Sequence, residues 1–122
     1  MEPPGKKPII GLVGPCGSGK STLITRLEQY GYACRHIAQE HSYVQTMWQV
    51  IAKPDILIYL ATSFPISTSR RKLNWREKDF TEQLRRLAHA HDHADLIIDT
   101  DNLSAEQVLQ KVLDYLRNAA SW

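Results

Sequence analysis

Eight consecutive residues carry the most recognisable chemistry of this chain: Gly14-Pro15-Cys16-Gly17-Ser18-Gly19-Lys20-Ser21. They fit the pattern G-x-x-x-x-G-K-[ST] of a phosphate-binding (Walker A) loop at every position. Glycine lets backbone N–H groups turn toward phosphate oxygens, and the positive end of a following helix adds to the attraction. The sequence therefore predicts a site for the phosphates of a nucleotide.

Each polar side chain of the loop has a role that follows from its chemistry. Lys20 carries an ammonium group that can bridge β- and γ-phosphates, and the Ser21 hydroxyl is a hard oxygen ligand for Mg²⁺. Thr22 is placed to donate a hydrogen bond to the α-phosphate. We predict that the nucleotide is bound by Gly14, Cys16, Gly17, Ser18, Gly19, Lys20, Ser21 and Thr22.

The segments on either side of the loop have the patterns of the elements that must hold it. The apolar run 9–13 predicts a buried strand, and 21–30 predicts an amphipathic helix because Leu23, Ile24 and Leu27 share one face. Strand, glycine loop and helix in this order are the context in which the motif is specific. We therefore prefer the phosphate-binding interpretation to a glycine-rich turn that carries a chance Lys-Ser pair.

The rest of the chain alternates between strand and helix patterns. Apolar runs predict strands at 32–37, 56–60 and 96–99. Periodic apolar residues predict helices at 42–53, 76–90 and 105–118, and Pro65 could open a short helix within 64–74. The helix at 42–53 is expected to bury Val44, Met47, Trp48 and Ile51. This order predicts an α/β fold of three layers, with helices on both faces of a small parallel sheet of about four strands.

Length and composition limit the organisation of the chain. Its 122 residues suffice for one domain and not for two. We expect the polar, proline-rich residues 1–8 to be a flexible lead-in and 9–122 to be a single domain. No apolar stretch approaches the roughly 20 residues of a membrane span, and the lead-in lacks the apolar part of a signal peptide. Cys16 and Cys34 have neither disulfide nor metal-ligand spacing, so we expect a cytoplasmic protein.

Two further segments resemble the shikimate-kinase-like family of small-molecule kinases. Residues 94–108 resemble the closing strand, loop and C-terminal helix of these kinases, and 54–60 resembles the strand before their lid. The basic stretch from Arg70 to Arg76 lies where that lid would be, so a lid-like segment is expected at about 65–80. The resemblance implies a kinase-like P-loop NTPase fold that uses Mg²⁺ and ATP and phosphorylates a small acceptor. GTP is less expected, because the chain has no N-K-x-D sequence for reading guanine.

The chain departs from that family between its second and third strands. Residues 38–53 leave space for one helix there, and not for an acceptor-binding segment with a further strand. Ala61 stands where an Asp often ends the corresponding strand. The resemblance therefore supports the phosphate-donor site more strongly than an acceptor site.

Candidate catalytic residues lie where the strands of a parallel sheet end, because ligands of such sheets bind at that edge. Glu40 and His41 follow the second predicted strand. Glu40 could hold the hydration shell of Mg²⁺ or act as a base. The alternative for Glu40 and His41 is that they merely occupy the first turn of a helix, where the helix dipole favours an acidic residue. Arg70 and Arg71 could neutralise a transferring phosphoryl group, and their alternative is a solvated helix face. The predicted catalytic residues are Lys20, Glu40, Arg70 and Arg71.

Two other polar groups have competing interpretations. His89, His91 and His93 would share one face of a strand and could bind a metal there, but we expect a helix end and a loop, which lose that geometry. Asp101 and Asn102 are interpreted as a turn before the last helix, and the alternative is a loop that contacts the nucleotide base.

Two functions follow from these observations. The first is phosphoryl transfer from Mg²⁺-bound nucleotide to a small acceptor or to water. The second is a non-enzymatic nucleotide-binding or regulatory module that a partner chain completes. A small sheet leaves an open edge that a second copy could pair with, so a homodimer is a candidate. We expect neither nucleic acid nor a membrane as a partner, because aromatic residues for base stacking are sparse beside the basic cluster.

Overall fold

Four parallel strands form one sheet in the order β2-β1-β3-β4. The computed structural model describes residues 8–71 and 76–118. The strands are β1 (Ile9–Val13), β2 (Ala33–His36), β3 (Ile56–Ala61) and β4 (Leu96–Asp99). In register, Ile10 of β1 lies beside Cys34 of β2 and Ile56 of β3, and Ile58 of β3 lies beside Leu96 of β4. The predicted α/β fold with a four-stranded parallel sheet is confirmed.

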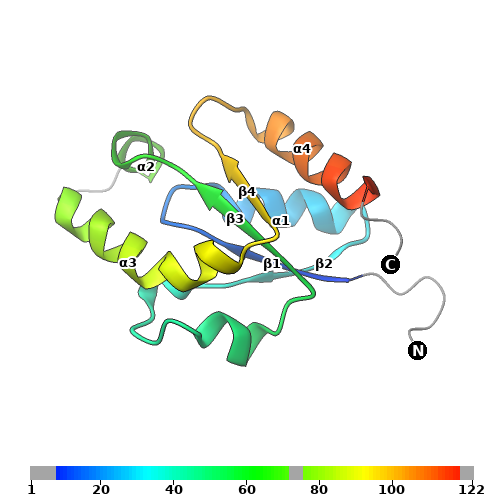
Figure 1. Cartoon of the computed structure of the whole chain (residues 1–122). Helices are drawn as coiled ribbons and strands as arrows, with labels where there is room; N and C mark the ends of the chain where they lie inside the picture. Colours follow the sequence, from blue (N-terminus) through cyan, green and yellow to red (C-terminus); the bar gives the residue numbers. More distant parts are fainter. Residues whose placement is uncertain (1–7, 72–75, 119–122) are drawn as a thin grey trace.

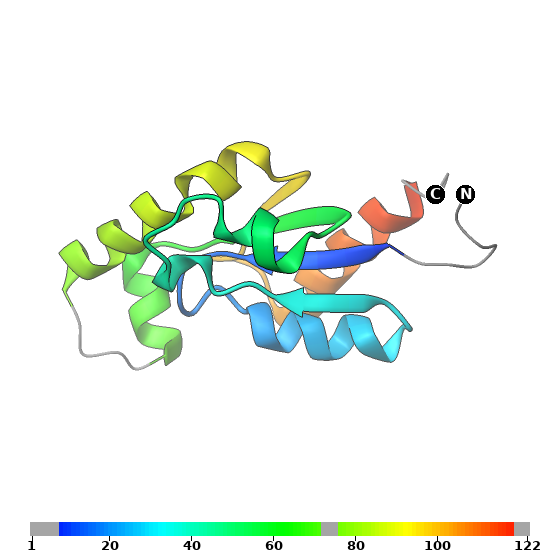
Figure 2. The same cartoon turned by 90° about the horizontal axis from the view of Figure 1, so that it is seen from below.

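Helices cover both faces of this sheet (Figures 1 and 2). On one face lie α1 (Lys20–Gln29) and α4 (Ala105–Asn118). On the other lie α3 (Glu77–His93), the short 3₁₀ turn η1 (Gln39–His41) and the π-helical turn η2 (Trp48–Ala52). The remaining helix, α2 (Phe64–Arg71), follows β3 at the carboxyl end of the sheet.

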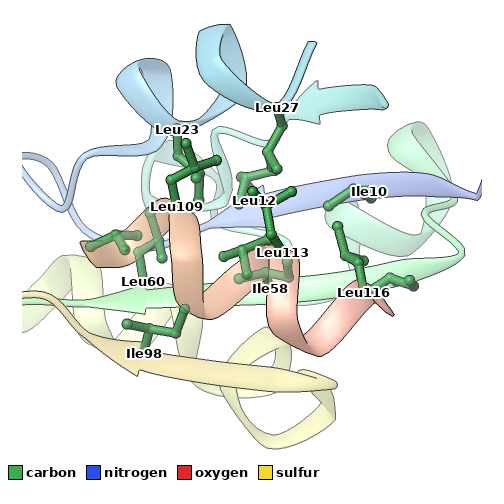
Figure 3. Close-up of a cluster of buried hydrophobic side chains, with 13 residues drawn as sticks. Ile10, Leu12, Leu23, Leu27, Ile58, Leu60, Ile98, Leu109, Leu113 and Leu116 are labelled. Atoms are coloured by element: carbon green, nitrogen blue, oxygen red, sulfur yellow. The ribbon is translucent and has the colours of Figure 1, made fainter. Parts of the chain in front are cut away.

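The face under α1 and α4 is filled by aliphatic side chains that interlock between helices and strands (Figure 3). Leu23 and Leu27 of α1 meet leucines and valines of α4 above the strand residues that point to this face. The cluster of buried residues is Ile10, Leu12, Leu23, Leu27, Ile56, Ile58, Leu60, Ile98, Val108, Leu109, Val112, Leu113 and Leu116. Burial of this much apolar surface is the main stabilising contribution to the fold.

The opposite face has a smaller apolar cluster and more polar contacts. Its buried apolar residues are Val13, Ile37, Trp48, Ala52, Leu57, Tyr59, Leu87 and Ala90. Between them lies Gln39, which is 1% exposed and hydrogen-bonds three backbone groups through its side-chain amide.

The predicted helix at 42–53 is wrong. Residues 42–46 are not helical, and helical structure is confined to residue 47 and the π-helical turn 48–52. The cause is Gln39: its Nε2 donates to the Val44 carbonyl (2.8 Å) and its Oε1 accepts from the Trp48 N–H (2.9 Å). These two backbone groups would bond to each other in an α-helix. Of the four residues expected to be buried, only Trp48 is, while Val44 and Ile51 are 50% and 68% exposed.

Candidate functional site

The candidate site lies where the four strands end, since each strand is followed by a polar loop at the same edge of the sheet. The glycine loop follows β1, Glu40 follows β2, Thr62 and Ser63 follow β3, and Thr100 follows β4. The strand order places the β1 loop between those of β2 and β3. Loops at one edge can therefore act together on one ligand.

The glycine loop is held tightly against β3. Gly14 has φ 151°, and a Cβ on it would lie 2.2 Å from the Leu60 carbonyl oxygen, so this position needs glycine. Gly19 has φ 101° and forms the N-cap of α1, whose first turn contains no acidic residue. The positive end of the α1 dipole and its unpaired N–H groups thus face the loop without a neutralising carboxylate in that turn.

Lys20 and Glu40 form a buried ion pair at the base of the loop. Lys20 Nζ lies 2.8 Å from Glu40 Oε2, and the side chains are 5% and 4% exposed. Lys20 also donates to the backbone carbonyls of Gly14 and Pro15. Removing one member of such a pair leaves an uncompensated buried charge, which costs about 3–5 kcal/mol.

Two buried polar atoms near this pair have no hydrogen-bond partner among the residues that the structure describes: Ser18 Oγ and Glu40 Oε1. Unsatisfied buried polar atoms are costly and therefore often mark a ligand site. The Glu40 charge also acts on its surroundings. Burial first, and the charge of Glu40 second, raise the pKa of Tyr59 to about 12.

A cavity of about 480 Å³ opens over these groups. Every predicted nucleotide-binding residue except Gly14 lines it, and Gly14 instead forms the base of the loop against β3. The lining residues are Cys16, Gly17, Ser18, Gly19, Lys20, Ser21, Thr22, Leu23, His36, Glu40, His41, Arg70, Thr100, Leu103, Ala105 and Val108. The wall away from the loop contains the apolar residues Leu103, Ala105 and Val108.

Arg70 ties α2 to the loop and to the end of β4. Its Nη1 donates to the Gly17 carbonyl (3.2 Å) and to Thr100 Oγ1 (2.8 Å), and its Nη2 donates to the Thr100 carbonyl. Thr100 is 2% exposed and also donates to the Ala61 carbonyl. Arg70 is thus positioned in the cavity wall, whereas the side chain of Arg71 and residues 72–75 of the expected lid lie outside the described part of the chain.

The loop after β4 carries an ionised carboxylate. Asp101 Oδ1 accepts hydrogen bonds from Thr62 Oγ1 (2.7 Å) and the Ser63 N–H (2.9 Å). Burial pushes the pKa of Asp101 up, but these hydrogen bonds and the charge of Arg70 outweigh it and hold the pKa below its usual value. The side chain fastens the end of β3 to the β4 loop.

Cys16 is fixed by contacts that sequence reasoning did not find. Gln83 Oε1 accepts from the Cys16 N–H (3.1 Å), Gln83 Nε2 lies 3.2 Å from Cys16 Sγ, and Ser67 Oγ donates to the Cys16 carbonyl. His41 Nε2 lies 3.8 Å from the same sulfur. The sequence contained one indication of these contacts, because Gln83 is a polar residue on the core face of α3, between Phe80 and Leu87.

The three alternating histidines lie within a helix, not in the expected helix end and loop, and they do not all share one side of it. Helix α3 continues to His93, so His89 and His93 stack on one side of it with ring centroids 4.1 Å apart. His91 instead packs its ring against Tyr59. His89 Nδ1 accepts from Trp48 Nε1 (3.1 Å). Their contacts serve packing on the α3 face of the sheet.

Comparison with solved structures shows which fold this is. The chain matches the structure "Shikimate kinase from Acinetobacter baumannii in complex with shikimate" with a TM-score of 0.69 and 16% sequence identity, over 96% of this chain and 97% of that one. The predicted three-layer α/β fold is therefore confirmed as the fold of this shikimate kinase structure. No protein-family model and no curated protein matches the sequence. Among the described residues, no helix is both long and apolar enough to cross a membrane.

Proposed function

We propose that this chain binds a nucleoside triphosphate as its Mg²⁺ complex and transfers the γ-phosphoryl group to a small acceptor or to water. The observation that carries the proposal is the convergence, in one cavity, of the phosphate-loop motif, the Lys20 ammonium, the N-terminus of α1 and the Arg70 guanidinium. Preference for ATP over GTP is supported by the likeness in fold to a kinase alone.

The phosphates would lie against the loop, with the β- and γ-phosphates near Lys20. Ser18 Oγ is a buried hydroxyl without a partner among the described residues, so it can donate to a phosphate oxygen at no cost in lost contacts. Arg70 already has its guanidinium in the cavity wall, where its charge would favour a polyphosphate.

The residues present fit a magnesium ion. Ser21 contributes a hydroxyl to the cavity lining, and Glu40 contributes a carboxylate oxygen that has no partner among the described residues. Both are hard oxygen donors of the kind that Mg²⁺ prefers. Ser21 would hold the ion directly and Glu40 through its hydration shell. When bound, the ion would neutralise charge on the transferring phosphoryl group.

Glu40 is also the proposed base. In transfer, the acceptor oxygen forms a bond to the γ-phosphorus, the bond to the β-phosphate oxygen breaks to release the nucleoside diphosphate, and the acceptor proton passes to Glu40. This role requires Lys20 to exchange its contact with Glu40 for one with phosphate. Positioning and charge neutralisation would supply most of the rate.

A specific observation favours a second candidate function, a nucleotide-binding module that a partner chain completes. Tyr43, Val44, Val50 and Ile51 are between 50% and 81% exposed on the segment that follows Glu40. Several large apolar residues exposed on one segment suit a protein-binding surface if they gather on one face. In that case the isolated chain binds nucleotide and does not consume it.

Calorimetric titration with Mg-ATP and Mg-GTP tests the proposal. We expect saturable binding by the wild type and a loss of at least about tenfold in affinity in Lys20→Gln/Glu40→Gln, because a charge-assisted hydrogen bond contributes about 1.5–3 kcal/mol. The double substitution leaves no unpaired buried charge, and Lys111→Ala removes an exposed charge from α4 as a control.

Two outcomes separate the alternatives. If Glu40→Gln keeps its nucleotide affinity but no longer consumes ATP in an acceptor screen, phosphoryl transfer is supported. Saturable binding by the wild type without consumption supports the binding module. Equal affinity of the wild type and the Lys20→Gln/Glu40→Gln variant would overturn the proposed phosphate site.

A further inference from the structure

Three side chains of different donor type converge at the mouth of the cavity. Cys16 Sγ, a Glu40 carboxylate oxygen and a His41 ring nitrogen all lie within 4.8 Å of one another. Cys16 belongs to the loop after β1, and Glu40 and His41 belong to η1 after β2. Because β1 and β2 are paired neighbours, their two following loops lie side by side.

We propose that Cys16, Glu40 and His41 form a binding site for a divalent cation of the zinc class. Thiolate sulfur, imidazole nitrogen and carboxylate oxygen together are the donor set of Zn²⁺, whereas Mg²⁺ and Ca²⁺ take oxygen ligands. The site shares Glu40 with the proposed Mg²⁺-nucleotide site, differs from it in the Cys16 and His41 donors, and does not require a nucleotide.

The distances between the donor atoms suit tetrahedral zinc. Zinc lies about 2.3 Å from sulfur and about 2.0–2.2 Å from nitrogen and oxygen, so ligand atoms on a tetrahedron are roughly 3.4–3.6 Å apart. Here His41 Nε2 lies 3.8 Å from Cys16 Sγ and 3.9 Å from Glu40 Oε2. A movement of a few tenths of an ångström of the His41 side chain, which is 60% exposed, brings these two distances to the zinc values, and the third separation, between Cys16 and Glu40, is at most 4.8 Å.

The arrangement is not that of a proton relay. In a Cys-His-carboxylate relay, one ring nitrogen faces the sulfur and the other faces the carboxylate. Here the same atom, His41 Nε2, faces both Cys16 Sγ and Glu40 Oε2. A single ring nitrogen close to both other donor groups is compatible with a shared cation and not with a relay.

The carboxylate has free capacity for a cation. Glu40 is 3% exposed, and its Oε1 has no hydrogen-bond partner among the described residues. Lys20 occupies only Oε2. A buried carboxylate oxygen without a partner is costly, and a cation would satisfy it. This observation is independent of the cysteine and the histidine.

Neighbouring residues orient the ligands. Gln83 binds both the backbone N–H and the sulfur of Cys16, whereas the Lys20 ammonium beside Glu40 Oε2 must give way to the cation. Partners that hold ligands in place in this way raise metal affinity. On binding, the Cys16 thiol releases its proton to solvent, so the thiolate and Glu40 balance the charge of the cation. All three ligands line the cavity, so the remaining coordination position faces it and can hold water.

Titration of the untagged, reduced and metal-stripped chain with Zn²⁺ against a chromophoric chelator tests the site. We expect one tightly bound Zn²⁺ per chain, weakened at least about tenfold in Cys16→Ser and in His41→Ala, since even loss of an orienting partner weakens metal binding 10–100-fold. Co²⁺ as a second probe is expected to give a sulfur-to-metal charge-transfer band that Cys16→Ser abolishes.

The chain offers matched controls. Cys34→Ser and His91→Ala are expected to leave zinc affinity unchanged. Burial first, and the charge of Glu28 second, raise the pKa of Cys34 to about 11, so this thiol stays protonated at neutral pH. Gln83→Leu, which removes only the orienting amide, is expected to weaken zinc binding while the stoichiometry is kept.

Two results would overturn the site. One is equal zinc affinity of the wild type, Cys16→Ser and His41→Ala when circular dichroism confirms that all three are folded. The other is a cobalt complex without the charge-transfer band. No nucleotide is present in these titrations, and their variants Cys16→Ser and His41→Ala leave intact Lys20 and Glu40, the residues that the nucleotide titrations change. Failure of one proposal is therefore distinguishable from failure of the other.

Discussion

The two faces of the sheet are built in different ways. Beneath α1 and α4 the buried residues are aliphatic, and they join both helices to β1, β3 and β4, while Cys34 of β2 packs against them. Beneath α3, η1 and η2 the apolar cluster is smaller, and side-chain amides fill the gaps: Gln39, Gln45 and Gln83 each hydrogen-bond backbone groups of other segments.

Because of this difference, the α1–α4 face contributes mainly to stability and the α3 face contributes to the geometry of the candidate site. Aliphatic packing is strong and non-directional, so the α1–α4 face stabilises the sheet without fixing any one group closely. Hydrogen bonds have preferred directions, so the α3 face can place Glu40 and Cys16 accurately at the cavity. The comparison predicts that damage to the first face changes stability alone and that damage to the second also changes the site.

The largest effect is expected for Leu113→Ala. Leu113 is 1% exposed within the aliphatic cluster, so truncation should lower the free energy of unfolding by about 2–5 kcal/mol. Urea denaturation measures this change. The affinity of the folded fraction for nucleotide should stay constant, and Leu84→Ala, at a residue 40% exposed, is the control. A loss of affinity in folded Leu113→Ala would break the separation between the two faces.

The next effect is expected for Gln39→Ala. It leaves the Val44 carbonyl and the Trp48 N–H without their side-chain partner, which should cost about 1–3 kcal/mol. Because Gln39 precedes Glu40, zinc and nucleotide affinity should fall as well. Denaturation and titration of the same preparation measure both quantities. Gln49→Ala, at an exposed residue of η2, should change neither.

A smaller, pH-dependent effect is expected for Asp101→Asn at the edge where the two faces meet. The pKa of Asp101 is lower in the folded chain than its ordinary value of 3.8, so its charge stabilises the fold above that pH, and the contribution is lost as the pH falls through the folded pKa. The variant should melt a few degrees below the wild type at pH 7. This gap should close as the pH falls below 3.8 and through the folded pKa.

Thermal melts over this pH range check that prediction, with Asp114→Asn on α4 as the control. A gap between Asp101→Asn and the wild type that persists unchanged in acid would show that the carboxylate acts through its shape and not through its charge.

The smallest effect is expected for Arg26→Ala. Arg26 Nη1 and Glu106 Oε2 lie 3.2 Å apart and bridge α1 to α4 outside the aliphatic cluster, with side chains 39% and 61% exposed. Exposed pairs contribute about 0.2–1 kcal/mol, and salt weakens them further. Urea denaturation at low and high salt should show a small difference that disappears at high salt. A large loss would mean that packing on this face depends on a polar contact.

Sequence reasoning predicted most of the fold because local patterns and tertiary structure agree there. The run before Gly14 is apolar because β1 is buried, and the periodicity after Lys20 and after Ser104 matches the buried faces of α1 and α4. Ser104 and Gln107 also form the reciprocal capping contacts that their spacing predicts. Such elements are encoded by residues near one another in the chain.

The parts of the fold and of the candidate site that the sequence did not predict depend on contacts between residues far apart in the chain. Val44, Met47, Trp48 and Ile51 have helical spacing, yet the amide of Gln39 takes the backbone groups that a helix would pair. The fixing of Cys16 by Gln83 joins positions 67 residues apart. Likewise, the spacing of Cys16 gives no hint of a metal site, because its proposed co-ligands come from the neighbouring strand's loop.

Because Lys20 and Glu40 neutralise each other, a ligand that binds one of them must come with a replacement charge for the other. An anion that draws Lys20 away leaves the Glu40 carboxylate buried without its cation, at a cost of about 3–5 kcal/mol. An anion that arrives together with a divalent cation avoids this cost, because the cation can replace the ammonium beside Glu40. The cavity should therefore select ligands by their charge balance more strongly than by their shape. It should bind a polyphosphate with its metal ion more tightly than free orthophosphate or metal-free nucleotide.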